Sequence, residues 1–125
     1  MSMVVAVACG GALGAVGRYL ISSYMQTVVG NAFPWGTLTV NVLGCAVLGI
    51  LVTILASIWS PTQEMRAFLT VGMMGALTTF SAFSLEIVLM IERAQWLLAG
   101  SYIAASINLC IAALFLAMVG TRAFL

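Results

Sequence analysis

The sequence contains no histidine and very little charge. Four Lys or Arg residues and three Asp or Glu residues leave a net charge of +1 over 125 residues. Such sparse charge provides no basic surface for nucleic acid or for anionic lipid headgroups. Without histidine, and without a pair of acids at catalytic spacing, the chain also lacks the groups that an enzyme would use. We therefore expect neither a nucleic-acid-binding protein nor an enzyme.

The three cysteines do not form a motif. Cys9, Cys45 and Cys110 lie in separate apolar segments, with no C-x-x-C spacing. This pattern predicts neither a zinc site nor a disulfide framework. We expect the cysteines to be buried as small residues.

Apolar sequence is what the chain has in abundance. Hydrophobic residues make up 64% of it and its mean hydropathy is +1.23, more than a soluble core requires. A helix that spans a membrane needs about 20 apolar residues, and four runs have that length: residues 3–29, 35–58, 66–91 and 96–120. The sequence thus predicts an all-α membrane protein, with four spans in a single transmembrane domain over residues 1–125.

The ends of two runs carry further signals. The first run has no Arg or Lys before it and continues past Arg18, so we expect a membrane span rather than a cleaved signal peptide. Thr62 stands before Gln63 and Glu64, a pattern typical of a helix start. We therefore expect the third helix to begin near this threonine.

Arginines in the short loops give almost no signal for orientation. With the amino terminus inside, Arg66 and Arg122 lie inside and Arg93 lies outside. Because Lys and Arg near the cytoplasmic side normally set the orientation, so weak a bias allows insertion in both directions. An antiparallel, dual-topology homodimer is one hypothesis. The alternative is that the amino-terminal amine fixes a single orientation.

The segment from Gly72 to Glu86 is the main clue to function. It reads GMMGALTTFSAFSLE, and its glycines, threonines and serines weaken a helix at membrane depth. Such sequence is tolerated in lipid only where protein buries it or where it lines an ion path. We predict a break in the third helix near Gly75 to Ser81, which frees carbonyls before it and amides after it. The chain is therefore interpreted as a conduit for something small.

Three side chains extend this path beyond the predicted break. Phe80 and Phe83 are three residues apart, and the positive edges of their rings can approach a small anion. Core filling is the alternative. Glu86 follows one turn later, either at the end of the path or as a hydrogen-bond partner of another helix.

The first two spans also carry polar residues. Arg18 lies mid-span, where insertion costs about 2.5–3.5 kcal/mol, so we expect it to face protein or a water-filled vestibule; snorkelling to an interface is the alternative. Thr37 and Asn41 share one face of the second span. They are candidates for a pore lining, although asparagine in a span also joins helices together.

In the fourth span Tyr102, Ser106 and Cys110 follow each other at i, i+4 and i+8. They form a second weakly polar stripe, unless the Ser106 hydroxyl bonds within its own helix. Four helices enclose little volume, so we expect association into at least a dimer.

Three segments carry a resemblance to a known family. They are GAVGRY at residues 14–19, PWGTLTVN at residues 34–41 and GALTTFSAFSLE at residues 75–86. The third is close to the family signature TTFSTFS-x-E. The chain thereby resembles the CrcB/Fluc fluoride channels of microbial plasma membranes along nearly its whole length. The resemblance implies a passive, fluoride-selective channel that exports fluoride across a bacterial or archaeal plasma (inner) membrane, built as an antiparallel dimer with two pores.

The resemblance also implies roles for individual residues. The implied fluoride path comprises Thr37, Asn41, Phe80, Ser81, Phe83, Glu86, Tyr102 and Ser106. Arg18 would shape the vestibule. The backbone carbonyls of Gly75 and Thr78, contributed by both subunits, would hold a structural sodium ion on the dimer axis. The implied partners are fluoride, the lipid bilayer and a second copy of the chain.

Three positions depart from the family pattern. Ala82 stands where threonine is usual, Ala76 where a second glycine is common, and Cys110 where serine is frequent. The missing hydroxyl at Ala82 removes one hydrogen bond, worth about 0.5–1.5 kcal/mol net. We expect an altered conductance and an unchanged selectivity.

Two other classes of membrane protein remain alternatives. A small four-span, proton-coupled multidrug antiporter has similar length and topology, but it needs an acid in its first span, where this chain has Arg18. A non-transporting assembly subunit would show no flux when purified alone. Fluoride efflux from liposomes separates these alternatives from a channel.

Overall fold

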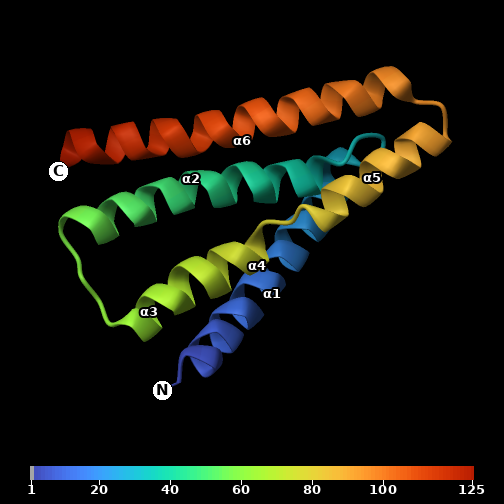
Figure 1. Ribbon diagram of the computed structural model, residues 1–125. Coiled ribbons are helices and arrows are strands. Elements are labelled where there is room, and N and C mark those ends of the chain that lie inside the picture. Colours follow the sequence, from blue (N-terminus) through green and yellow to red (C-terminus); the bar gives the residue numbers. More distant parts are fainter. Residues whose placement is uncertain (1) are drawn as a thin grey trace.

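The computed structural model describes residues 2–125 and contains only helices within that range (Figure 1). The elements are α1 (Met3–Val29), α2 (Trp35–Ser57), α3 (Gln63–Ala67), the π-helix η1 (Phe68–Met74), α4 (Gly75–Leu77), α5 (Ser81–Glu92) and α6 (Trp96–Phe124). Together α3, η1, α4 and α5 make up the third span. Across residues 2–125, four helical segments are long and apolar enough to cross a membrane. The prediction of an all-α membrane fold is therefore confirmed.

The bounds of the helices differ from the predicted spans mainly at their ends. The third span begins at Gln63 rather than at residue 66 because Thr62 caps it, its hydroxyl accepting a hydrogen bond from the Met65 amide at 3.2 Å. The expected start of this helix is thus confirmed. The fourth helix continues to Phe124, four residues beyond the predicted end at residue 120.

The two halves of the third span have different neighbours. The first half, α3 to α4, packs along α1, whereas α5 packs against α6. The helices α2 and α6 lie side by side, and α2 also contacts α1 (Figure 1). The third span therefore passes from one group of helices to another at its midpoint.

Glycines allow the backbones of α1 and η1 to approach closely. A Cβ atom at Gly10 would overlap the carbonyl oxygen of Phe68, and one at Gly14 would overlap that of Met73. A Cβ atom at Gly72 would lie 2.8 Å from the Val7 carbonyl oxygen. In lipid, where apolar burial does not drive helices together, such close contact is what holds them. The wide π turns of η1 thus present their carbonyls to a glycine face of α1.

A left-handed residue ends α5. Ala94 has a φ of 59°. Its N–H donates to the Ile91 carbonyl at 3.0 Å, and the Gln95 N–H donates to the Met90 carbonyl at 2.9 Å. This pair of bonds is the Schellman arrangement, in which glycine is the usual left-handed residue. The turn is therefore strained at Ala94, and α6 begins directly after it at Trp96.

Candidate functional site

The third span is interrupted at Thr78 to Phe80. The helix α4 ends at Leu77, Thr78 is extended with φ −86° and ψ 157°, and α5 begins at Ser81. The predicted break near Gly75 to Ser81 is therefore present, although it is shorter than that range. Figure 1 shows it as a non-helical link between the two halves of the span.

The side chain of Asn41 stabilises this break from α2. Its Oδ1 accepts a hydrogen bond from the Thr79 N–H at 2.8 Å, and its Nδ2 donates to the Thr79 carbonyl at 3.0 Å. Both backbone groups of Thr79 are thus satisfied by one amide. Because an amide nitrogen carries two hydrogens, one N–H of Asn41 remains for another acceptor.

The geometry of the break releases two backbone carbonyls from helical bonding. In an uninterrupted α-helix, each carbonyl accepts from the N–H four residues later. The Thr79 N–H instead donates to Asn41, so the Gly75 carbonyl loses its donor. The Ala82 N–H instead donates to the Thr79 hydroxyl at 3.1 Å, so the Thr78 carbonyl loses its donor as well. The break therefore frees the two carbonyls that the resemblance implies as sodium ligands.

Glu86 joins three spans. Its Oε2 accepts a hydrogen bond from the Thr37 hydroxyl on α2 and its Oε1 accepts one from the Tyr102 hydroxyl on α6, both at 2.9 Å. Glu86 is therefore a hydrogen-bond partner of two other helices, in agreement with the alternative given for it above. Thr37 and Tyr102 are themselves buried, so the carboxylate has two donors in fixed positions.

Aromatic rings connect the break with Glu86. The centroids of Phe80 and Phe83 are 5.4 Å apart, and Phe83 meets Tyr102 edge to face at 5.0 Å. Phe33 makes a second edge-to-face contact with Tyr102 at 5.2 Å. Phe83 is buried, whereas Phe80 is 76% exposed. The two phenylalanines therefore differ sharply in environment within one chain.

A cavity of about 510 Å³ lies beside the break, and its walls come from α2, α6 and the third span. We call it the break cavity. Its lining includes Asn41, Cys45, Phe80, Phe83, Ser106 and Cys110. The Ser106 hydroxyl is buried and has no hydrogen-bond partner within residues 2–125. The alternative in which the Ser106 hydroxyl bonds within its own helix is therefore not found in the described part of the chain, and the hydroxyl is left beside the cavity.

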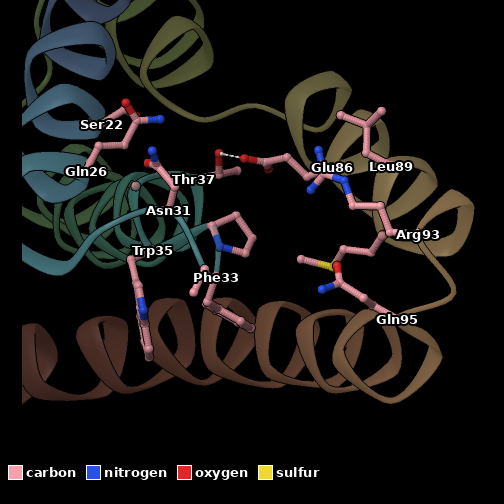
Figure 2. A pocket seen from close by; sticks show the side chains of 14 residues that line it. Ser22, Gln26, Asn31, Phe33, Trp35, Thr37, Glu86, Leu89, Arg93 and Gln95 are labelled. Carbon is pink, nitrogen blue, oxygen red and sulfur yellow. Dashed lines mark hydrogen bonds between the residues drawn. The ribbon is translucent and has the colours of Figure 1, made fainter.

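A second cavity, of about 180 Å³, lies at the end of the molecule where the loops before α2 and α6 meet. We call it the loop cavity. Figure 2 shows Glu86 and Arg93 on one side of it, facing Thr37, Asn31 and Gln26. The Glu86 carboxylate points across toward the Thr37 hydroxyl. The carboxylate therefore lies at the inner wall of a polar, open cavity.

The structure groups most of the candidate residues. Asn41, Phe80, Phe83 and Ser106 line the break cavity; Thr37 and Glu86 line the loop cavity; and Tyr102 contacts residues of both. Ser81 is exposed at the start of α5, its hydroxyl 3.3 Å from that of Thr79. Arg18 is half-buried on α1 and lines neither of these two cavities.

Sequence reasoning missed the part played by Thr79. Its hydroxyl accepts from the N–H three residues later, as an N-cap does, and its backbone meets Asn41. The signal was a threonine three residues before Ala82, a capping spacing. Arg93, Gln26 and Asn31 of the loop cavity were also missed, since their meeting depends on the packing of distant segments.

These features define a class: a multi-pass helical membrane protein with an interrupted span beside a partly polar cavity. Residues 5–118 match the family described as "CrcB-like protein, Camphor Resistance (CrcB)". The protein named "Fluoride-specific ion channel FluC" of Rhodospirillum centenum is 48% identical over 115 residues, which cover 92% of this chain and 91% of that protein.

Two further relatives carry the same name. That of Rhizobium johnstonii is 42% identical over 123 residues, 98% of each chain. That of Agrobacterium fabrum is 46% identical over 109 residues, 87% of each chain. The chain belongs to the CrcB-like family, and the resemblance found from its motifs is confirmed.

Proposed function

We propose that this protein is a passive, fluoride-selective channel that exports fluoride across the plasma membrane and so relieves fluoride toxicity. The relatives are named fluoride-specific ion channels. The observation that carries the proposal is the buried Ser106 hydroxyl, which lacks a partner within the described residues and lies beside a cavity that Phe80 and Phe83 also line. No bond is made or broken in such transport, so the protein is not an enzyme.

The physical demand of fluoride fits this lining. A small, strongly hydrated anion needs a dense set of donors in place of its water. The break cavity offers the Ser106 hydroxyl, the second N–H of Asn41 and the edges of two phenylalanine rings. From there the proposed path passes Tyr102 and continues to Thr37 and Glu86 at the loop cavity. The proposed path also includes Ser81, and Arg18 is proposed as a residue of its vestibule.

We infer a dual-topology, antiparallel homodimer from the face around the break. Gly75 and Phe80 are both exposed on the single chain, next to backbone carbonyls without helical donors. Lipid cannot satisfy such groups, so protein must cover them. A second copy presents a face of matching composition, and the weak charge bias of the loops permits the inverted orientation.

Sodium is the ion that we propose at the dimer axis. The released carbonyls of Gly75 and Thr78 are neutral oxygen ligands, which suit a hard cation. Two carbonyls from each chain would give four ligands on the axis. The ion would balance the partial negative charge of the half-helix ends that meet there. Its part is structural.

One observation favours the antiporter alternative. Glu86 is an acid within a membrane span, and it faces the open loop cavity. Against this, both carboxylate oxygens already hold hydroxyl donors, and the first span carries Arg18 where this class requires an acid. The channel therefore fits the arrangement better.

Fluoride efflux from liposomes tests the proposal. Purified protein in liposomes loaded with potassium fluoride should release fluoride rapidly when valinomycin supplies the counter-charge. The matched experiment with potassium chloride should show negligible release. If correctly folded dimers release no fluoride, the channel proposal is wrong, and a proton-driven assay with cationic drugs then tests the antiporter.

A further inference from the structure

Two of the three cysteines line the same cavity. Cys45 on α2 and Cys110 on α6 both line the break cavity, and these two helices pack side by side. Cys9 is exposed on α1 and lines neither cavity described above. The packed helices thus create a pair of thiols that the sequence spacing of 65 residues (110 minus 45) does not reveal.

The pair continues the polar faces of both helices. Cys45 comes one turn after Asn41, and Cys110 comes one turn after Ser106, so each thiol shares a face with a residue of the break cavity. Met74 places a thioether in the same lining. Thiols and thioethers are soft ligands, which select soft metal ions over sodium, magnesium or calcium.

We propose that Cys45 and Cys110 form a two-thiol site for a soft metal ion such as Hg²⁺, and that an ion held there obstructs the break cavity. Delivered as neutral HgCl₂, the metal exchanges both chlorides for sulfur. Two S–H and two Hg–Cl bonds break, two S–Hg bonds form, and two protons leave with two chlorides. No oxidant is needed. The binding step stands alone, and the obstruction of ion flow rests on the proposed function.

A pair of thiols retains the metal where a single thiol releases it. When one S–Hg bond opens, the second sulfur keeps the ion next to the first. The effective concentration of the neighbouring thiol is at least about 1 mM. A free monothiol at about 10 µM competes with it for the metal at about a 100-fold lower concentration, so the pair should resist exchange about 100-fold better than a lone cysteine. Cys9 provides the lone cysteine within the same chain.

The first test counts mercury on the intact purified protein. The protein is exposed to HgCl₂, washed with a dilute monothiol, and analysed for bound mercury by elemental mass spectrometry. We expect one retained ion per chain in the wild type and in Cys9→Ser. Cys45→Ser and Cys110→Ser should each lose it. If Cys45→Ser and Cys110→Ser retain as much mercury as the wild type, or if Cys9→Ser loses it, the proposed site is wrong.

The second test measures fluoride efflux of each variant with and without bound mercury. Mercury should abolish efflux in the wild type and in Cys9→Ser, while Cys45→Ser and Cys110→Ser should each keep their own mercury-free rate. Mercury that is retained by the pair without slowing efflux would overturn the obstruction. Absence of efflux before mercury is added would instead contradict the proposed function alone, because the mercury count does not depend on transport.

Discussion

The amide of Asn41 binds both backbone hydrogen-bonding groups of Thr79, 38 residues away in the sequence, at distances of 2.8 and 3.0 Å. The N–H and the carbonyl of Thr79 at the helix break would otherwise be left unsatisfied within the membrane, where no water replaces the lost partner. The second span thus fixes the conformation of the third. The same contact diverts the Thr79 N–H and so releases the Gly75 carbonyl.

Replacing Asn41 with leucine should destabilise the protein and abolish fluoride efflux. The change leaves two backbone groups of Thr79 without partners, at about 1–3 kcal/mol for each group. Unfolding in mixed micelles measures the loss. Asn108 is a matched control, since its amide is exposed and donates only to the Ala104 carbonyl of its own helix. Asn108→Leu should change the free energy of unfolding by less than about 0.5 kcal/mol; equal losses in both variants would refute the assigned contact.

Isoleucine in place of either phenylalanine at the break should suppress fluoride efflux. Isoleucine keeps an apolar side chain and removes the positive ring edge that an anion approaches. Phe83→Ile should also lower stability, because that ring is buried against Tyr102, whereas Phe80 is 76% exposed in the single chain. Efflux assays and unfolding of the same preparations separate the two effects. Retained efflux in both single variants would rule out coordination by ring edges.

Alanine in place of neighbouring glycines of α1 should change stability in opposite directions. Gly10→Ala and Gly14→Ala force a methyl group against carbonyl oxygens of η1, and such overpacking costs about 1–3 kcal/mol. Gly11 has open space around its Cβ position. Gly11→Ala should therefore leave stability unchanged or raise it by up to about 1 kcal/mol. Thermal unfolding of the three variants gives the comparison, and a loss at Gly11 equal to that at Gly10 would contradict the close contact with η1.

Glycine at position 94 should stabilise the turn between α5 and α6. Ala94 has a positive φ, which glycine adopts without the steric cost of a Cβ atom. Ala94→Gly should raise the free energy of unfolding by about 1 kcal/mol. Ala104→Gly, within the exposed surface of α6, should lower it by about 1 kcal/mol. Stabilities that fall in both variants would show that the turn gains nothing from glycine.

Sodium should stabilise the protein against unfolding. Bound at 100 times its dissociation constant, an ion that prefers the folded dimer contributes about 2.7 kcal/mol. Melting curves in sodium and in N-methyl-D-glucamine measure this difference. Thr78→Ser should retain it, because the proposed ligand is a backbone carbonyl. Thr78→Pro should reduce it, because it removes the N–H that donates to Met74 at 3.2 Å and disturbs the carbonyl. Equal sodium dependence in the proline variant would rule out the carbonyl site.

The sequence predicts the location of the site better than its bonds. The spacing of Thr37 and Asn41 correctly indicated one polar face, but their partners Glu86 and Thr79 lie on the third span, and only packing brings them together. The helix-weakening residues indicated the break between Gly75 and Ser81. They gave no sign of η1, a π-helix whose carbonyls lie against the glycines of α1.

The sequence likewise did not predict that Cys45 and Cys110 line one cavity. The three cysteines were expected to be buried small residues, because their spacing matches no motif. The expected burial is wrong: Cys9 is exposed, and Cys45 and Cys110 are half-buried beside the break cavity. Cys45 and Cys110 line one cavity because α2 and α6 lie side by side. Contacts between spans thus depend on how the helices are rotated about their axes, which apolar sequence with polar residues on several faces does not determine.

Thr78 to Phe80 form a joint, by which we mean the non-helical connection between two parts of the third span that pack on different helices. Before the joint, η1 and α4 are tied to α1 by backbone contacts at glycines; after it, α5 is tied to α2 and α6 through Glu86. Asn41 of α2 braces the joint itself. A tilt of α1 against α6 would therefore change these three residues, where the proposed ion sites also lie, as well as the contact between α1 and α2.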